Sequence, residues 1–233
     1  MLTIIIPVFN EKKFIRILLK KLTKIRIKKQ IIVVDDGSND GTSEILKKEY
    51  SKKKSLYKII FHKTNLGKGA AIKSATKYIK GTYVGIQDAD LEYNPKDLVK
   101  IYNYINKNKF FAVYGSRVLN KNKYQNTNNF THLIRIWANY LLTVISNFIN
   151  SQNLTDAHTC YKVLKSNLFK NLNLKENGFA FCPEVNTKLS KKKINIIEIP
   201  ISYNGRTYKD GKKISTLDGL IALFCLIKYR IIS

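Results

Sequence analysis

The sequence predicts an α/β fold, a mostly parallel sheet flanked by helices. Short runs of β-branched residues alternate with amphipathic segments through the first half of the chain, and polar residues gather directly after those runs. The chain has 233 residues, of which 44% are hydrophobic, enough for a substantial core. No stretch resembles a flexible linker, so we expect one domain over residues 1–233 whose second half, from about Arg117, builds onto the sheet.

Each element of the first half has its own signal. Ile15, Leu18, Leu19 and Leu22 recur at helical spacing between lysines, and Pro95 stands where the first turn of a helix tolerates proline. The β-branched runs between such segments are short enough to be buried strands. The expected strands are residues 4–8, 31–34, 57–61, 83–86 and 110–114, separated by helices that begin near residues 15, 42, 69 and 95.

The second half is expected to hold two apolar helices and a late strand. Between residues 133 and 149, polar residues interrupt the apolar ones at steps of three or four, which predicts a helix with one narrow polar stripe. Such a helix is either buried or lies in lipid. Residues 194–201 predict a strand, 203–213 a loop rich in Gly and Lys, and 217–232 a last helix that carries Lys228 and Arg230. For both helices, core packing is the alternative to contact with lipid.

The charge of the chain points to an anionic partner. Forty-two Lys and Arg against 16 Asp and Glu give a formal charge of +26, which suits nucleic acid, a phosphorylated ligand or a membrane surface. A genome's base composition could also produce the excess of Lys, Asn and Ile, leaving part of the charge as a solvated coat. Neither Gly-x-Gly-x-x-Gly after the first strand nor Gly-x4-Gly-Lys-Ser/Thr occurs, which disfavours nicotinamide-dependent dehydrogenases and P-loop kinases.

Cysteine usage and hydropathy favour a cytoplasmic location. Cys160, Cys182 and Cys225 are odd in number and include no Cys-x-x-Cys pair, so neither a disulfide framework nor a structural zinc site is expected. The N-terminus reads as a first strand rather than a signal peptide, and no run of 18 apolar residues occurs. We therefore expect a cytoplasmic protein for which peripheral attachment to a membrane surface stays open.

Ligands of open α/β sheets bind beyond the carboxyl ends of the strands, and four of these ends are polar. Asp88 and Asp90, separated by the small Ala89, can point two carboxylates at one hard cation such as Mg²⁺ or Mn²⁺, and Glu92 can add a third oxygen. The alternative is an Asx-turn or a helix N-cap before Pro95. The four polar segments are residues 7–11, 35–38, 88–92 and 115–117.

A glycine-rich turn over residues 65–70 precedes a predicted helix. Gly67 and Gly69 allow close backbone approach, and Lys68 with free helix amides could face an anion. A plain turn is the alternative.

Taken together, these motifs resemble those of a known family. They are, in chain order, IPVFNE at 6–11, VDDGSNDGT at 34–42, NLGKG at 65–69, DAD at 88–90, GSR at 115–117, TCYK at 159–162, and PISY, RTY and GKKI within 200–214. With them the chain resembles the GT-A glycosyltransferases of family 2, and within that family the polyprenyl-phosphate (dolichyl-phosphate) mannose or glucose synthases and their bacterial relatives. The resemblance spans nearly the whole chain.

The resemblance implies a Rossmann-like, nucleotide-sugar-binding half over residues 1–116 and an acceptor-side half over 117–233 that ends in a loop and an amphipathic helix. It also implies that a divalent cation, Mg²⁺ or Mn²⁺, is held against the diphosphate of the donor. Relatives often have Gln at the position of Glu92. The implied nucleotide-sugar site is Pro7, Glu11, Asp35, Asp36, Lys68 and Asp88; the metal site is Asp88, Asp90 and Glu92; and the catalytic groups are Asp90, Arg117, Arg206 and Lys212.

The implied reaction is inverting transfer of a hexose from a UDP- or GDP-linked sugar to a polyprenyl or dolichyl phosphate. A lipid monophosphate is already ionised near pH 7, so no strong general base is required. This agrees with His62, His132 and His158, which lie near no nucleophile motif and which we expect to be structural. Transfer to a sugar hydroxyl of a glycan or glycolipid is the alternative, and it would need a carboxylate base such as Glu184.

The expected partners follow from the same residues. A nucleic-acid-binding module would explain the charge but gives no reason for the pair Asp88 and Asp90, so no nucleic-acid partner is expected. Basic residues beside the apolar faces of the two late helices favour an anionic membrane surface, at the cytoplasmic face. Many relatives append membrane helices that this sequence lacks, so attachment would depend on amphipathic segments, and a membrane-protein partner is a further candidate.

Overall fold

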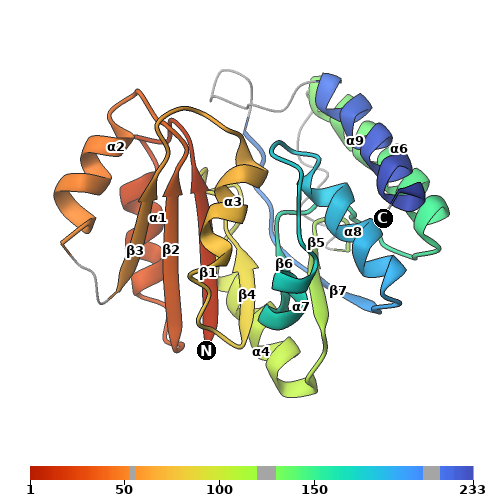
Figure 1. The fold of residues 1–233 in the computed structure, drawn as a ribbon, viewed down its shortest axis with the longest axis horizontal. Coiled ribbons are helices and arrows are strands. Elements are labelled where there is room, and N and C mark those ends of the chain that lie inside the picture. The colour runs from red at the N-terminus through yellow and green to blue at the C-terminus, as the bar shows by residue number, and fades with distance from the viewer. Residues whose placement is uncertain (53–55, 120–129, 207–215, 233) are drawn as a thin grey trace.

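One sheet runs through both halves of the chain (Figure 1). In the computed structural model, which describes residues 1–52, 56–119, 130–206 and 216–232, seven strands pair in the order β3-β2-β1-β4-β6-β5-β7. All of them run parallel except β6, which lies antiparallel between β4 and β5. The predicted mostly parallel α/β fold is therefore confirmed. The strands are β1 Leu2–Val8, β2 Lys29–Asp35, β3 Tyr57–Phe61, β4 Tyr83–Ile86, β5 Ala112–Ser116, β6 Lys162–Lys165 and β7 Ile196–Pro200.

Helices cover both faces of this sheet (Figure 1). The apolar positions that predict the first helix are all fully buried, because residues at helical spacing share the face turned to the sheet. The helix at Pro95 begins as expected, with the side chain of Asn94 accepting from the amide of Lys96 at 3.1 Å. The helices are α1 Ile15–Thr23, α2 Thr42–Ile45 with its π-helical continuation Leu46–Tyr50, α3 Lys68–Thr76, α4 Pro95–Asn108, α6 Phe130–Asn150, α7 Ser166–Asn171, α8 Phe181–Lys191 and α9 Thr216–Ile231.

Strand β6 was not predicted from the sequence. It is only four residues long and has a lysine at each end, so it shows no apolar run. Lys162 is nevertheless 1% exposed, because its ammonium donates to the carbonyl of Ala157 at 2.9 Å and lies 3.9 Å from the centre of the Tyr114 ring. Since β6 runs against its neighbours, the residues before it lie at the carboxyl edge of the other strands.

Contacts at that edge join the two halves. The hydroxyl of Tyr161 donates to the side chain of Gln87 at 2.7 Å, and the amide of Gly115 donates to the carbonyl of Tyr161 at 2.8 Å. The ends of β4 and β5 are therefore tied together by the segment that precedes β6. The edge where ligands are expected is built by residues from both halves of the chain.

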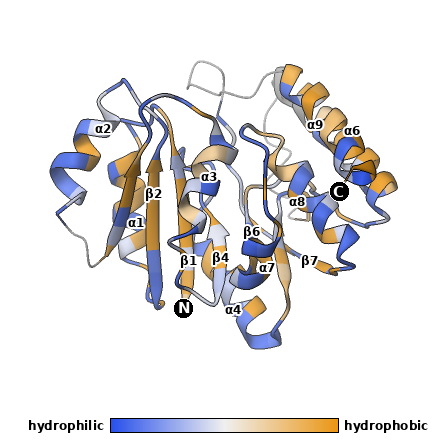
Figure 2. Cartoon of the chain, viewed as in Figure 1, coloured by the Kyte–Doolittle hydropathy of each residue, from blue (hydrophilic) through white to orange (hydrophobic). Residues whose placement is uncertain are grey.

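Helices α6 and α9 lie side by side at one end of the molecule, next to α8 (Figure 1). Figure 2 shows that both helices are predominantly hydrophobic along their length. One face of each is covered by the protein and the other is exposed, so core packing accounts for only half of each helix. Within the described residues, no helix combines the length and the apolar run needed to cross a bilayer.

Two glycines at the start of α3, Gly67 before it and Gly69 in its first turn, are required by close packing. Gly67 has a φ of +99°, and a Cβ on Gly69 would overlap the carbonyl oxygen of Glu176. The amide of Ala70, in the first turn of the helix, is also in use, since it donates to the carbonyl of Asn177 at 3.0 Å. The turn therefore serves as a contact between α3 and the segment before α8, which supports the plain-turn alternative, and an anion at the start of α3 stays a prediction.

We expect Gly69→Ala to destabilise the protein by roughly 1–3 kcal/mol, because its methyl group would collide with backbone of the neighbouring segment. Chemical denaturation measures the loss. Gly178→Ala is the matched control on the same contact, since no atom lies within 4 Å of the point that its Cβ would occupy, and a change within about 0.5 kcal/mol is expected. Equal stabilities of the two variants would contradict this account of the turn.

Candidate active site

Four carboxylates gather at the carboxyl edge of the sheet, and we call them the acidic cluster: Glu11, Asp88, Asp90 and Glu92. Glu11 follows β1, and the other three follow β4, which pairs directly with β1. Glu11 and Glu92 are 6% and 7% exposed. Carboxylates this deeply buried need compensating positive charge.

The guanidinium of Arg206 provides that charge for three members of the cluster. It lies 3.2 Å from Glu11 through Nη1 and again through Nη2, 3.2 Å from Asp90 through Nη2, and 3.8 Å from Glu92 through Nε. Burial opposes the charged form of Arg206, but the nearby carboxylates raise its pKa. The sequence predicted a role for Arg206 at phosphate groups, and the structure places it among the acidic side chains.

Asp90 is the carboxylate most affected by this environment. Burial, followed by the charges of Asp88 and Glu92, raises the pKa of Asp90 to about 7, with Arg206 acting in the opposite direction. One oxygen of Asp90 accepts from the amide of Glu92 at 3.1 Å, which is the Asx-turn that the sequence left open. The other oxygen faces Arg206. Both interpretations of Asp90, turn residue and site residue, therefore fit the structure.

Lys68 pairs with the remaining member of the cluster. Its ammonium lies 2.5 Å from Asp88. Burial alone would lower the pKa of Lys68, but Asp88 and the neighbouring Cys160 and Cys182 together raise it. Lys68 thus carries positive charge beside the first carboxylate after β4, and its contact with a nucleotide sugar stays a prediction.

Glu92 has an additional task that the sequence did not predict. The hydroxyl of Tyr203 donates to one of its oxygens at 2.7 Å, and the amide of Arg206 donates to the other at 2.6 Å. The carbonyl of Glu92 also accepts from the amide of Asn204 at 2.9 Å. Glu92 therefore anchors the segment that delivers Arg206, while a metal-ligand role for it stays a prediction.

Asp35 and Asp36 lie at the end of β2. They are next to Pro7 of β1, which pairs with Val34 of β2. Asp35 accepts from the hydroxyl of Ser43 and from the amide of Ser38. The pair is 1% and 3% exposed. Their positions beside β1 suit a nucleotide-binding turn, and their roles toward base and ribose stay predictions.

His62 is a residue of this region whose contacts the sequence did not reveal. Its Nδ1 lies 2.6 Å from Asp36, and its Nε2 lies 2.8 Å from the hydroxyl of Ser74 in α3. Asp36 also accepts from the amides of Leu66 and Gly67, at 3.0 and 2.8 Å. His62 and Asp36 together hold the glycine turn against the end of β2, which agrees with the structural role expected for His62.

Arg117 follows β5 and is held by Asp156. Its Nε and Nη2 lie 2.6 and 2.7 Å from the two oxygens of Asp156, and Nη2 donates to Asn139 of α6 at 3.3 Å. Asp156 is fully buried; burial would raise its pKa, but Arg117 holds it below the ordinary value. The guanidinium of Arg117 also lies 5.0 Å from the Tyr203 ring. Tyr203 thus lies between Arg117 and Glu92 of the acidic cluster. Contact of Arg117 with phosphate stays a prediction.

Two further candidates have different outcomes. Glu184 is fully buried and accepts from the amides of Lys175 and Glu176 at 2.7 and 2.8 Å and from the ammonium of Lys188 at 2.7 Å. These bonds make it a structural anchor of α8. Lys212 lies outside the described residues.

The acidic cluster fits a divalent cation by its chemistry, because carboxylate oxygens are the ligands that Mg²⁺ and Mn²⁺ prefer. A cation, the Arg206 guanidinium, already lies between three of its members. No three His, Cys, Asp or Glu side chains among the described residues converge as a ready metal site. The cluster therefore has the oxygen ligands that a metal ion needs, but its carboxylates are spaced around the guanidinium of Arg206 rather than around one metal position.

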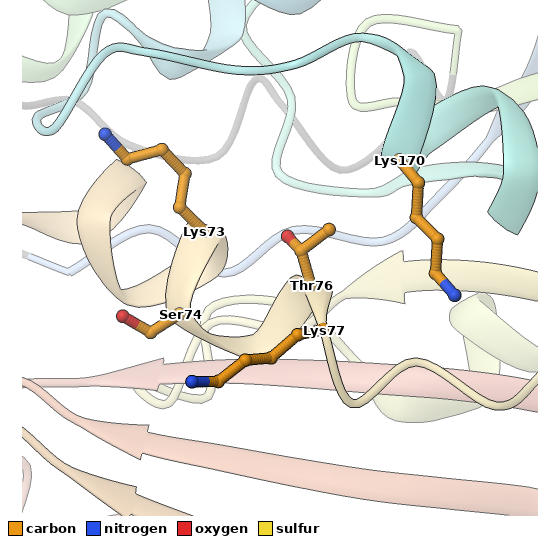
Figure 3. A pocket seen from close by; sticks show the side chains of 5 residues that line it. All are labelled: Lys73, Ser74, Thr76, Lys77 and Lys170. Atoms are coloured by element: carbon orange, nitrogen blue, oxygen red, sulfur yellow. The ribbon is translucent and has the colours of Figure 1, made fainter.

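A hollow of about 610 Å³ lies at the other end of α3 from Lys68 (Figure 3). The ammonium of Lys73 donates to the carbonyl of Lys175 at 2.6 Å, and that of Lys170 donates to the carbonyl of Ile79 at 3.1 Å. No carboxylate lines the hollow, and these lysines bond backbone, so it is not a candidate active site. It is lined by Lys73, Ser74, Thr76, Lys77 and Lys170.

The overall architecture is shared with solved glycosyltransferases. Glucosyl-3-phosphoglycerate synthase from Mycobacterium tuberculosis, solved with Mn²⁺, UDP and phosphoglyceric acid, superposes with a TM-score of 0.69 at 12% identity, covering 100% of this chain and 79% of that one. The mannosyltransferase PcManGT from Pyrobaculum calidifontis, solved with GDP-Man and Mn²⁺, gives a TM-score of 0.59 at 14% identity over 99% of this chain and 70% of that one. The fold is that of the GT-A glycosyltransferases.

Sequence comparison then gives the family. The model of the family described as "Glycosyl transferase family 2" matches residues 3–172, and the chain belongs to this family. Two uncharacterized proteins of Methanocaldococcus jannaschii are each 30% identical to it, one over 90% of this chain and 93% of its own length, the other over 98% and 91%. The dolichyl-phosphate beta-glucosyltransferase ALG5D of Trichomonas vaginalis is 29% identical over 86% of this chain and 64% of its own length. The protein is a glycosyltransferase, as its motifs implied.

His158 gives a test of the charged network behind the site. Burial, followed by the charge of Lys162, lowers the pKa of His158 to about 4, and within the described residues its buried Nε2 has no hydrogen-bond partner. An unfolded histidine titrates near 6.5, so the stability due to neutral His158 is complete above that pH and is lost as the pH falls toward 4. At pH 5 we expect a loss of about 2 kcal/mol from this group.

Denaturant unfolding at pH 7.5 and pH 5 measures this loss, and His158→Gln supplies the comparison because it removes the titrating ring. The variant should lose less stability between the two pH values than the native protein. The same pH dependence in both proteins would show that His158 is not held neutral.

Proposed function

We propose that the protein transfers a hexose, with inversion, from a UDP- or GDP-linked sugar to a polyprenyl or dolichyl phosphate at the cytoplasmic face of a membrane. Support for a nucleotide-sugar donor comes from solved neighbours that hold UDP or GDP-Man together with Mn²⁺. Support for the acceptor comes from the dolichyl-phosphate glucosyltransferase of Trichomonas vaginalis. The observation that carries the proposal is the buried acidic cluster at the carboxyl edge, compensated by Lys68 and Arg206.

The donor half of the site would work through charge. Asp88, Asp90 and Glu92 would hold Mg²⁺ or Mn²⁺, which supplies neutralisation of the charge that builds on the leaving diphosphate, an effect usually worth several kcal/mol. Lys68 already places an ammonium beside Asp88. Pro7, Glu11, Asp35 and Asp36 line the ends of β1 and β2, where base and ribose would bind.

The acceptor half favours a nucleophile that is already ionised. Transfer to a sugar hydroxyl would need a carboxylate base, and Glu184, the candidate for that task, is fully buried and bonded to two amides and a lysine. A phosphate monoester needs no such base, but it must be brought to a second anion. Arg206 and Arg117, with Lys212 beyond the described residues, are the groups that we propose for this task.

The apolar outer face of α6 and α9 supports a membrane location. Thirteen large apolar side chains, twelve on these two helices and Ile232 directly after α9, are between 44% and 88% exposed, and a gathering of this size is not typical of scattered surface residues. Aromatic residues on α6 and the basic Lys228 and Arg230 near the end of α9 suit the boundary between lipid and water. The side chains are Ile134, Trp137, Tyr140, Leu141, Val144, Phe148, Leu217, Leu220, Ile221, Phe224, Ile227, Ile231 and Ile232.

An acceptor panel tests the proposed reaction. The protein would be incubated with Mn²⁺ and UDP- or GDP-hexoses in turn, with a polyprenyl phosphate, the matching polyprenol, or free saccharides as acceptors. We expect product only with the phosphate, with a β linkage formed from an α-linked donor. Transfer to saccharides but not to the lipid phosphate would overturn the acceptor assignment.

Asp90→Asn is the control for site chemistry in the same assay. It removes the charge and keeps the shape, so we expect a fold that melts as the native protein does and a rate reduced more than about 100-fold. Unchanged turnover in this variant would remove the acidic cluster from the mechanism.

A vesicle-binding experiment tests the membrane location. We expect the double substitution of Trp137→Ser and Phe224→Ser, on α6 and α9, to weaken co-sedimentation with anionic phospholipid vesicles by at least about tenfold, because each large apolar side chain contributes about 1.5 kcal/mol or more when buried. Phe111→Ser is the control, since Phe111 is 51% exposed but lies outside this face. An equal loss in the control, or none in the double variant, would count against the assignment.

A further inference from the structure

We propose that Arg206 and the divalent cation are alternative occupants of the acidic cluster. In the donor-free protein, Arg206 acts as an internal counter-ion, and its guanidinium withdraws when the cation binds. This inference rests on the proposed function only in taking the cluster as the cation site. It adds a property of the resting enzyme, in which a side chain of the acceptor-side half competes for the oxygens that the cation needs.

The hydrogen bonds of the cluster show which carboxylate oxygens Arg206 and a cation would compete for. Nη2 of Arg206 donates to Oδ2 of Asp90 at 3.2 Å, and the amide of Glu92 donates to Oδ1 of the same carboxylate at 3.1 Å. Both oxygens of Asp90 are therefore engaged. The guanidinium also bonds both oxygens of Glu11, at 3.2 Å each. A cation that coordinates Asp90 through Oδ2 must take the place of Arg206 there.

Electrostatics makes joint occupancy unfavourable. A guanidinium and a divalent cation sharing the same carboxylate oxygen would lie only a few ångströms apart, where like charges repel strongly in a poorly solvated site. The side chain of Arg206 is 13% exposed and that of Asp90 is 15% exposed, so water screens the pair only weakly. The guanidinium of Arg206 would therefore leave the acidic cluster when Asp90 holds a cation.

The backbone around Arg206 permits this exchange. Glu92 holds the segment through the hydroxyl of Tyr203 and the amides of Asn204 and Arg206, at 2.7, 2.9 and 2.6 Å. None of these three bonds uses the guanidinium. The side chain of Arg206 can thus leave the cluster by rotating about its own bonds while its backbone stays anchored at the edge of the site.

Two consequences follow for binding. The cation should bind weakly to the donor-free protein, because it must first displace Arg206. A nucleoside diphosphate gives the displaced guanidinium a new anionic partner, so it should strengthen cation binding, and the cation should strengthen nucleotide binding by the same factor.

Titration with Mn²⁺ followed by electron paramagnetic resonance, first without nucleotide or acceptor and then with UDP, tests the proposal. We expect Arg206→Gln to bind Mn²⁺ at least fivefold more tightly than the native protein, and UDP to strengthen binding by a smaller factor in the variant. Arg16→Gln is the control, since Arg16 pairs with Glu49 on the surface and lies outside the site. Affinity for Mn²⁺ within twofold of native in Arg206→Gln would overturn the proposal.

Arg206→Lys separates occupancy from simple loss of charge. The lysine keeps the positive charge but cannot bond Glu11 and Asp90 as a fork, so displacement predicts tighter Mn²⁺ binding than in the native protein. Native affinity in Arg206→Lys, with tighter binding only in Arg206→Gln, would reduce the effect to charge and overturn the exchange. The titration involves no transfer, so failure of the acceptor assignment and failure of this inference are distinguishable.

Discussion

Carboxylates withdrawn from water must be compensated, and this constraint organises the active site. The parallel pairing of β1 with β4 brings Glu11 beside Asp90 at one edge of the sheet. The compensating charge for both comes from Arg206, in the segment after β7, while Lys68, at the start of α3, compensates Asp88. The site is complete only when both halves of the chain share one sheet, and β6 and β7 from the second half extend that sheet.

Helix α6 joins this site to the apolar outer face. Its polar stripe holds the segment before β6: Asn147 exchanges two hydrogen bonds with Leu154, and the hydroxyl of Thr143 accepts from the amide of Ala157. Between them lies Asp156, which fixes Arg117. The predicted stripe of polar residues thus positions a charged network, while the opposite face leaves large apolar side chains exposed, the face that we propose for contact with lipid. A single helix serves both purposes because its two faces differ so sharply in polarity.

The sequence predicted the strands and helices whose pattern is local. Strands β3 and β4 have the predicted bounds, while β5 begins two residues later than predicted, and β6, α7 and α8 were missed. The strand β6 was missed because buried lysine looks like surface lysine in a sequence. Side-chain pairing was equally hidden: the contacts of Arg206 with Glu11 and Glu92 join residues far apart in the chain, and no spacing rule predicts them. The order of the motifs in the sequence identified the candidate residues. Only the fold shows which of their side chains pair with one another.

The pairing of charges also bears on the choice of acceptor. A base for a sugar hydroxyl must be a carboxylate with an oxygen free to take a proton. Both oxygens of Glu184 accept from backbone amides, and Glu198 accepts from the amides of Thr155 and Asp156. Both carboxylates therefore have structural roles. The acidic cluster itself is engaged by the positive charges of Lys68 and Arg206. Burial raises the pKa of Asp90 to about 7, which suits a general base, but one of its oxygens accepts from the amide of Glu92 and the other lies against Arg206. Asp90 could therefore take a proton from a sugar hydroxyl only after losing one of these contacts, whereas an acceptor that is already ionised makes no such demand.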